Sequence, residues 1–238
     1  MLLLRTDDVL ALAKPAGVSM ATSSRTGKSE REIVARLLDA CGVRDGGPLH
    51  LVHRLDVGTS GVVLLARTEA AHRALSRALQ EKTAEKTYRA LVWGHPVPAR
   101  GRIDLPLGRD PKDGRKMCVA KEGKPSATAY RTLRRYPGLA DLEVSPETGR
   151  THQIRVHLGA KGHPVVGDDL YGGSERWHGV RNPRLRDALS GVGHPLLHAA
   201  RIVVPALSLD VEAPLPPDYG RLLSLLAPGD PRSARGEG

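Results

Sequence analysis

A stretch that is apolar on both of its faces most constrains the fold of this chain. In an extended backbone, residues 86–94 direct their apolar side chains to both sides, Tyr88, Ala90 and Val92 to one and Leu91 and Trp93 to the other. Apolar side chains on both faces are typical of a strand inside a covered sheet. We therefore expect residues 86–94 to form a central strand.

The remaining apolar patterns predict further strands and four helices. Strands are expected at residues 2–4, 9–13, 49–52, 62–66, 126–133, 139–144, 196–204 and 207–211. Helices are expected from a capping box at residues 29–32 to residues 41–42, over 69–81 capped by Thr68, over 152–160 capped by Thr151, and over 219–226. Residues 109–124 are expected to form an exposed basic loop and 168–182 a further loop. The prediction is one domain, residues 1–227, with a flexible tail at 228–238.

The charge of the chain favours a polyanionic partner. Its 238 residues contain 36 Lys and Arg against 26 Asp and Glu, which gives a formal net charge of +10. Such a balance is typical of proteins that bind nucleic acid. No apolar run approaches the roughly 20 residues of a spanning helix, and the first residues do not resemble a signal peptide. We therefore expect a cytoplasmic protein without a membrane partner.

Residues 53–61, His-Arg-Leu-Asp-Val-Gly-Thr-Ser-Gly, are the main candidate for chemistry. From this stretch alone, Arg54 and Asp56 can be read as a surface ion pair, which is common and weak. Alternatively, Asp56 is a nucleophile or base, which requires partial desolvation and a fixed cation within reach. Arg155 is a candidate for that cation. A helix that opens at Thr151 would also direct its N–H groups toward an anion.

Three other motifs fail on their spacing. The run at residues 26–29 lacks the first glycine of a phosphate-binding loop, because position 22 is Thr. Ser60 lacks the second glycine of a nucleophile elbow, because position 62 is Val. His152 and His157 are five residues apart, about 140° around a helix, whereas a zinc pair favours a separation near four. We expect no metal site.

Several stretches, taken in order, resemble the RluA-type pseudouridine synthases. The principal ones are residues 53–61, the Lys-Thr-Tyr run at 86–88 with Ala90, Val92 and Gly94, and the run Thr-Gly-Arg-Thr-His-Gln-Ile-Arg-Val-His at 148–157. Shorter matches lie at 14–17, 163–164, 167–168 and 197–199. The resemblance extends over about residues 7 to 217. It departs at Ala13, where the family often has Asn.

The resemblance implies an α+β fold with a central mixed, mainly antiparallel sheet, flanking helices and a basic active-site cleft. It also implies that the protein isomerises uridine to pseudouridine in structured rRNA or tRNA. Asp56 matches the catalytic aspartate, which attacks the uridine while the base leaves through N1, rotates and rejoins the sugar through C5. Tyr88 matches the tyrosine that stacks on the base, and Arg155 the basic residue that pairs with the aspartate. Because the isomerisation conserves all atoms, no cofactor is expected.

The resemblance further implies a set of RNA contacts. Arg54 matches the arginine that fills the gap left by the flipped nucleotide. The full set expected to contact RNA is His53, Arg54, Arg150, His152 and Gln153. The pattern begins almost at Met1, without the small S4-like RNA-binding domain that some relatives carry, so recognition is expected from the catalytic domain itself. We expect a monomer and no DNA partner.

Two other functions fit part of the pattern. A non-catalytic RNA-binding module of the same fold would keep the basic surface, but it would not need Asp56, Tyr88 and Arg155 to converge. A carboxylate-dependent nuclease or glycosidase would normally need a second acid or a metal cluster. No second acid with suitable spacing is evident in the sequence.

Overall fold

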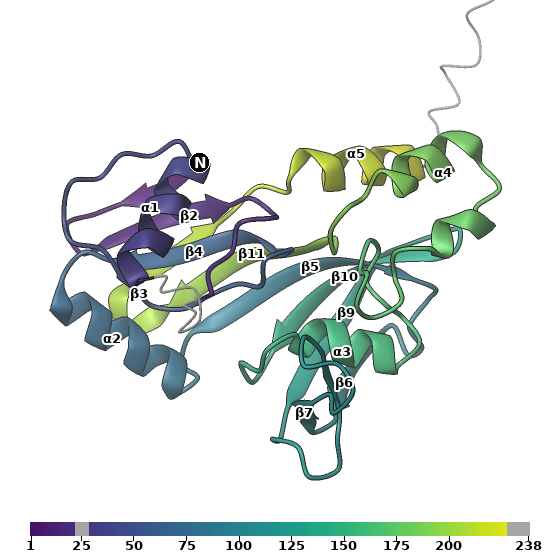
Figure 1. Cartoon of the computed structure of the whole chain (residues 1–238), viewed down its shortest axis with the longest axis horizontal. Helices are drawn as coiled ribbons and strands as arrows, with labels where there is room; N and C mark the ends of the chain where they lie inside the picture. The colour runs from purple at the N-terminus through teal and green to yellow at the C-terminus, as the bar shows by residue number, and fades with distance from the viewer. Residues whose placement is uncertain (22–28, 228–238) are drawn as a thin grey trace, which may run out of the picture.

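A ten-stranded sheet forms the centre of the computed structural model, which describes residues 1–21 and 29–227 (Figure 1). Eight strands follow the order β1-β2-β4-β11-β5-β10-β9-β6, while β12 pairs with β11 and β3 with β4. Only β4 and β11 pair in parallel among these described strands, so the expected mixed, mainly antiparallel sheet is confirmed. The predicted tail at 228–238 lies outside the described residues.

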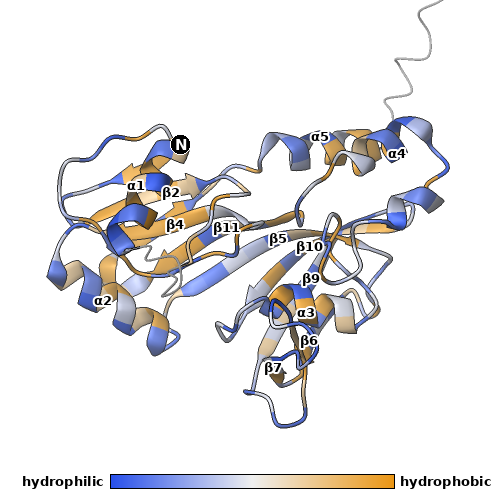
Figure 2. Cartoon of the chain, in the orientation of Figure 1, coloured by the Kyte–Doolittle hydropathy of each residue, from blue (hydrophilic) through white to orange (hydrophobic). Residues whose placement is uncertain are grey.

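Most strands lie close to their predicted positions. The bounds of the strands are β1 Leu2–Arg5, β2 Val9–Lys14, β3 His50–Leu51, β4 Ser60–Ala66, β5 Glu85–Trp93, β6 Arg100–Asp104, β9 Ala127–Tyr136, β10 Leu139–Pro146, β11 Leu197–Val204 and β12 Leu209–Glu212. The sequence patterns do not predict β6. β5 is the expected central strand, because it pairs with β11 on one side and β10 on the other. Figure 2 shows apolar residues concentrated along β4 and β10.

Helices cover both faces of the sheet. They are α1 Glu30–Ala40, α2 Glu69–Gln80, α3 Gln153–Ala160, α4 Pro183–Ser190 and α5 Pro217–Leu226, with 3-10 turns at Arg176–Gly179 and Pro205–Leu207. α1 packs on the face of β4 that carries Val63 and Leu65, and α2 on the face that carries Val62 and Leu64. On β5, α3 covers the Ala90 side, and α4 with α5 covers the Leu91 side. The alternation read from residues 86–94 therefore reflects burial of β5 on both faces.

Two of the predicted helix caps are confirmed and one is wrong. The capping box of Ser29 and Glu32 opens α1, and the Thr68 hydroxyl accepts from the Ala71 N–H at the start of α2. Thr151 does not cap α3. The N-cap is His152, in the left-handed conformation with φ 54° and no side-chain cap bond. This backbone region is sparsely populated for residues other than glycine and costs about 1 kcal/mol or more.

Three other local predictions differ from the structure. Residues 109–124 are not only a loop, because β7 Leu107–Arg109 and β8 Met117–Val119 form a hairpin there. The expected loop at 168–182 contains a 3-10 turn. α4 was not predicted, although Asn182 caps it and Pro183 occupies its first turn, a common start signal. Short elements bury few side chains, so their apolar pattern is weak.

No helix within residues 1–21 and 29–227 combines the length and apolar character needed to cross a membrane.

Candidate active site

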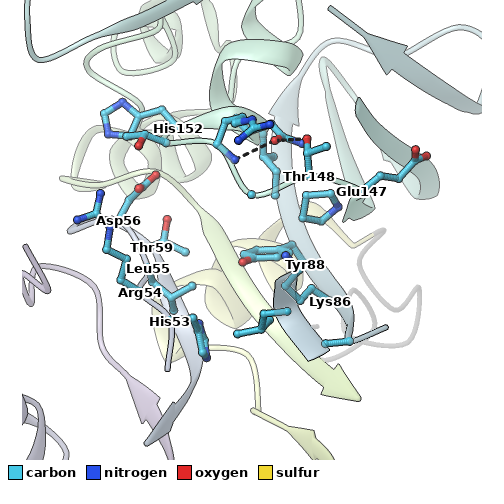
Figure 3. Close-up of a pocket in the computed structure, with 18 of the residues that line it drawn as sticks. His53, Arg54, Leu55, Asp56, Thr59, Lys86, Tyr88, Glu147, Thr148 and His152 are labelled. Carbon is cyan, nitrogen blue, oxygen red and sulfur yellow. Dashed lines mark hydrogen bonds between the residues drawn. The ribbon is translucent and has the colours of Figure 1, made fainter. Parts of the chain in front are cut away.

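A cleft of about 690 Å³ lies between the residues around Asp56, the end of α2 and the start of α3 (Figure 3). β5 contributes Tyr88 and Lys86 to its wall, and Asp56 and His152 face it from two loops. The lining includes all eight residues predicted to act in catalysis or RNA contact, namely His53, Arg54, Asp56, Tyr88, Arg150, His152, Gln153 and Arg155. Segments about a hundred residues apart in sequence therefore meet at one site.

Lys14 fixes the loop that carries Asp56. Its ammonium group donates to the carbonyl oxygens of Pro15 and Val18 at 3.0 Å each and of Val57 at 3.2 Å. The side chain is buried, and burial lowers the pKa of Lys14 to about 8 although the charge of Asp56 opposes this shift. The last of these bonds joins the end of β2 to the residue that follows Asp56.

The loop enters β4 through a close approach that requires glycine. Gly61 has φ +115°, and a Cβ there would lie 2.2 Å from the Ala199 carbonyl oxygen, because β4 pairs in parallel with β11 at this point. The Ser60 hydroxyl donates to His198 Nδ1 at 2.9 Å, since His198 Nε2 donates to the Ala213 carbonyl. These contacts anchor the start of β4 a few residues after Asp56.

Arg155 joins two carboxylates. Its Nε and Nη2 atoms donate to Asp168 Oδ2 and Oδ1 at 2.7 and 2.8 Å, and its Nη1 atom lies 3.8 Å from Asp56 Oδ2. Asp168 is fully buried and also accepts from the backbone N–H groups of Leu170 and Tyr171. The planar guanidinium thus uses one edge for Asp168 and leaves its remaining nitrogen for Asp56.

The surroundings keep Arg155 charged and fixed. Burial lowers the pKa of Arg155, but the hydrogen bonds and charge of Asp168, with the charge of Asp56, outweigh it and raise the pKa. The guanidinium also lies 5.1 Å from the centre of the Tyr171 ring, a favourable cation–π distance. The Tyr171 hydroxyl contacts His152 Nδ1 at 2.8 Å and accepts from the Met117 N–H. Asp56 therefore faces a permanent positive charge in a rigid frame.

Tyr88 lies in the same cleft as a neutral phenol. Burial, assisted by the negative charge of Asp56, raises the pKa of Tyr88 above its usual range. A phenol that retains its proton is a poor base at neutral pH. It keeps a flat aromatic face and a hydrogen-bond donor, which suit contact with a planar base.

The predicted RNA contacts divide into two groups. Arg54 and Arg150 are exposed, and their side chains form no hydrogen bond or ion pair with other described residues. Gln153 is buried, and its amide contacts Thr148, Arg150, Ala127 and Thr128. It holds the loop before α3, which explains why Thr151 has no capping role. Contact of Gln153 with RNA stays a prediction.

His53 also has a structural contact. Its Nε2 atom accepts from the Leu64 N–H at 3.1 Å and so ties the loop to β4. Burial, with a smaller effect from the charge of Lys86, lowers the pKa of His53 to about 4. The imidazole is therefore neutral at pH 7, and its contact with RNA stays a prediction.

The partly buried His53 predicts sensitivity to acid. Between pH 6.5 and 4 the unfolded chain binds a proton at His53 that the folded protein does not, so the free energy of unfolding falls as the pH is lowered, by up to about 3 kcal/mol from this residue. His53→Gln keeps a hydrogen-bond acceptor but cannot titrate. Urea unfolding at pH 7 and pH 4 should therefore show a smaller acid loss for His53→Gln.

The matched control for this experiment is His178→Gln, on an exposed 3-10 turn. It should retain the acid loss of the wild-type protein. An equal acid loss in the His53 and His178 variants would contradict a partly buried, neutral His53.

Sequence reasoning gave no role to three residues that hold the site. Asp168 and Lys14 enter the sequence prediction only within stretches that resemble the family, and Tyr171 does not enter it. An acid in a loop gives no signal of its partner, and Lys14 looks like an ordinary strand-end cation. A lysine that follows a run of buried strand residues was the one available hint, because such positions are seldom solvated.

Comparisons with known proteins identify the family of this chain. The sequence model of the family described as RNA pseudouridylate synthase matches residues 8–160. The chain is 40% identical to an uncharacterised RNA pseudouridine synthase of Mycobacterium bovis, over 98% of this chain and 72% of that protein. It is 35% identical to the dual-specificity RNA pseudouridine synthase RluA of Escherichia coli, over 96% and 93%. The structure of human RNA pseudouridylate synthase domain containing 1 is similar, with a TM-score of 0.70, 29% identity and coverage of 97% and 96%.

Proposed function

The chain belongs to the RNA pseudouridylate synthase family and is an isomerase that acts on RNA, and we propose that Asp56 is the carboxylate that reacts with the target uridine. One observation carries this assignment. Asp56 lies 3.8 Å from the fixed guanidinium of Arg155, in a cleft that also contains the phenol of Tyr88. A non-catalytic RNA-binding module would have no need for this arrangement.

The reaction balances within the substrate. The N1–C1′ bond of the uridine breaks, the base rotates, and a C5–C1′ bond forms. C5 gives up its proton and N1 gains one, so no atom is gained or lost overall and no redox change occurs. In the proposed scheme the Asp56 carboxylate bonds to C1′ as the N1–C1′ bond breaks, and this bond to Asp56 breaks again as C5 of the rotated base attacks C1′. Arg155 holds and orients the carboxylate throughout. Tyr88 stacks on the base, and its neutral phenol can donate a hydrogen bond.

A uridine inside a stem must leave the helix before it can reach Asp56. Extrusion costs a few kcal/mol, and protein side chains must offset part of that cost. Arg54 is exposed at the cleft, two residues before Asp56, and is free of ion pairs with other described residues. It is therefore placed to occupy the gap in the stem, as the family resemblance implies.

Arg54→Ala should slow conversion of uridines in stems by about tenfold or more, and that of unstructured uridines much less, because only a stem leaves a gap to fill. Initial rates on two transcripts with the same flanking sequence, one paired and one unpaired, measure the difference. Arg184→Ala is the control, since Arg184 is exposed on α4 away from the cleft. Equal slowing on both transcripts by Arg54→Ala would remove the gap-filling role.

The RNA substrate belongs to this proposal as well. We expect structured rRNA or tRNA, recognised in the cytoplasm by a monomeric catalytic domain of residues 1–227. The net charge of +10 supports a grip on phosphates. Mapping pseudouridines in total RNA from cells with and without the protein should reveal one or a few sites that depend on it. Identical maps would contradict the proposed cellular function.

A further inference from the structure

The cleft extends along β5 beyond Tyr88, which is proposed to stack on the flipped base. Lys86 precedes Tyr88 by two residues, so both side chains leave the same face of the strand, about 7 Å apart. Both face the cleft in Figure 3. Ser76 and Gln80 of α2 and Lys82 after it also line the cleft. We call Ser76, Gln80, Lys82 and Lys86 the distal subsite. In Figure 3, Asp56 lies across the cleft from Lys86.

Lys86 is a half-buried cation without a counterion among the described residues. Burial lowers the pKa of Lys86, and its positive charge in turn lowers that of His53. The nearby acids do not neutralise it, because Glu81 bonds Arg77 at 2.8 Å and Glu85 projects from the opposite face of β5. Glu147 also lines the cleft but pairs with Arg102 at 3.0 Å. A partly desolvated ammonium group without an anion is unfavourable. The site is therefore short of a negative charge that a ligand can supply.

The other members of the distal subsite fit the same anion. Lys82 adds an exposed positive charge, and Ser76 and Gln80 offer neutral hydrogen-bond donors. Among the described residues that line the cleft, Tyr88 is the only Phe, Tyr or Trp, so the distal subsite is suited to a backbone and not to a second stacked base. In a chain that acts on RNA, the anion with this geometry is a phosphate of the strand that carries the target uridine.

We propose that the distal subsite binds a backbone phosphate of the RNA strand next to the flipped uridine, with Lys86 as its principal contact. This inference rests on the proposed function, because it assumes that the target base binds at Asp56 and Tyr88. It gives the strand a direction out of the active site, along β5 toward the end of α2. Lys86 thus positions RNA and takes no part in bond breaking.

The salt dependence of RNA binding tests this contact. Each phosphate contact to a single strand contributes about 0.7 to the slope of log affinity against log salt. Lys86→Gln should reduce the slope by about 0.7, so its binding defect should shrink about 2.6-fold between about 50 and about 200 mM salt. Lys86→Arg keeps the charge and should keep the slope. The measurement is fluorescence anisotropy of a short labelled oligouridylate.

Kinetics separate positioning from packing. On RNA that the wild-type protein modifies, Lys86→Gln should raise KM several-fold at low salt and leave kcat unchanged. Lys161→Gln, an exposed lysine at the far end of α3, is the matched control and should leave both unchanged. If Lys86→Gln does not fold, Lys82→Asn provides the test, because Asn tolerates the φ of 59° at this position. It should reduce the slope in the same way.

A slope for Lys86→Gln equal to that of the wild type would overturn the subsite, as would an identical loss in Lys86→Arg. Failure of the proposed function looks different. In that case the wild-type protein forms no pseudouridine, whatever slopes the variants show.

Discussion

Asp56→Asn should abolish pseudouridine formation, with a loss of at least about 10³-fold in rate, while RNA affinity stays within a few-fold of the wild type. The amide has the same shape as the carboxylate, so the cleft and its phosphate contacts persist. It carries no negative charge and is a much weaker nucleophile. Nucleoside chromatography of RNA incubated with each protein measures the product, and filter binding measures the affinity.

Asp187→Asn is the control for the Asp56 variant. Asp187 is exposed on α4, outside the cleft, and its replacement should leave both product and affinity unchanged. Turnover by Asp56→Asn near that of the control would show that the reacting group is elsewhere.

Asp168→Asn should affect both stability and turnover. Asp168 is fully buried and anchors Arg155 with two bonds. The amide of Asn carries no charge and has one acceptor oxygen in place of two, so among the described residues the buried guanidinium keeps only Asp56, 3.8 Å away, as an ion-pair partner. Breaking a buried ion pair of this kind typically costs about 3–5 kcal/mol. We expect the free energy of unfolding in urea to fall by that amount, and kcat to fall with little change in RNA affinity.

The neighbouring Asp169 provides a matched control. It is exposed, and Asp169→Asn should have near-wild-type stability and turnover. If Asp168→Asn unfolds too readily to be assayed, Asp168→Glu keeps the charge at a shifted position and should lower kcat in a folded protein. Wild-type stability and kcat in both Asp168 variants would contradict its role as the anchor of Arg155.

The sequence predicts structure best where the pattern within one element reveals which of its faces are buried or where it begins. Residues 86–94 carry apolar side chains on both faces, and β5 is indeed covered by α3 on one side and by α4 with α5 on the other. Ser29 and Thr68 mark helix starts through bonds to residues only three positions away. Such local signals can be recognised in the sequence without knowledge of the tertiary structure.

The sequence predicts which residues line the active-site cleft better than it predicts what each of them contacts. A reactive carboxylate needs a nearby cation, and this requirement together with the family resemblance predicts Arg155 beside Asp56. In the structure the two side chains lie 3.8 Å apart. The stronger partner of Arg155 is Asp168, whose loop position gives no hint of where it folds back. Gln153 and His53 illustrate the same limit. Amide and imidazole groups can form hydrogen bonds with RNA or with the protein backbone. Which of the two they contact depends on their neighbours in the folded protein.

The helix predicted over residues 152–160 is confirmed by α3 Gln153–Ala160, and only its predicted cap at Thr151 is wrong. Six consecutive residues from Gln153 to Leu158 are buried, so the helix has no polar stripe to separate from an apolar one. The N-cap conformation at His152 is set by the hydrogen bonds of Gln153 to the preceding loop and to β9. The bonds to β9 join residues that are 25 or more positions apart in the sequence. A capping rule that considers only nearby residues therefore selected Thr151.

The central claim is that Asp56 drives the isomerisation of uridine, and release of the C5 hydrogen tests it most directly. Formation of the C5–C1′ bond expels the hydrogen of C5 into water, so RNA labelled with tritium at C5 of uridine should release tritium in proportion to the pseudouridine formed. The wild-type protein should release it without changing the mass of the unlabelled RNA, and Asp56→Asn should release none. Release by Asp56→Asn at the wild-type rate, or product without release, would contradict the account.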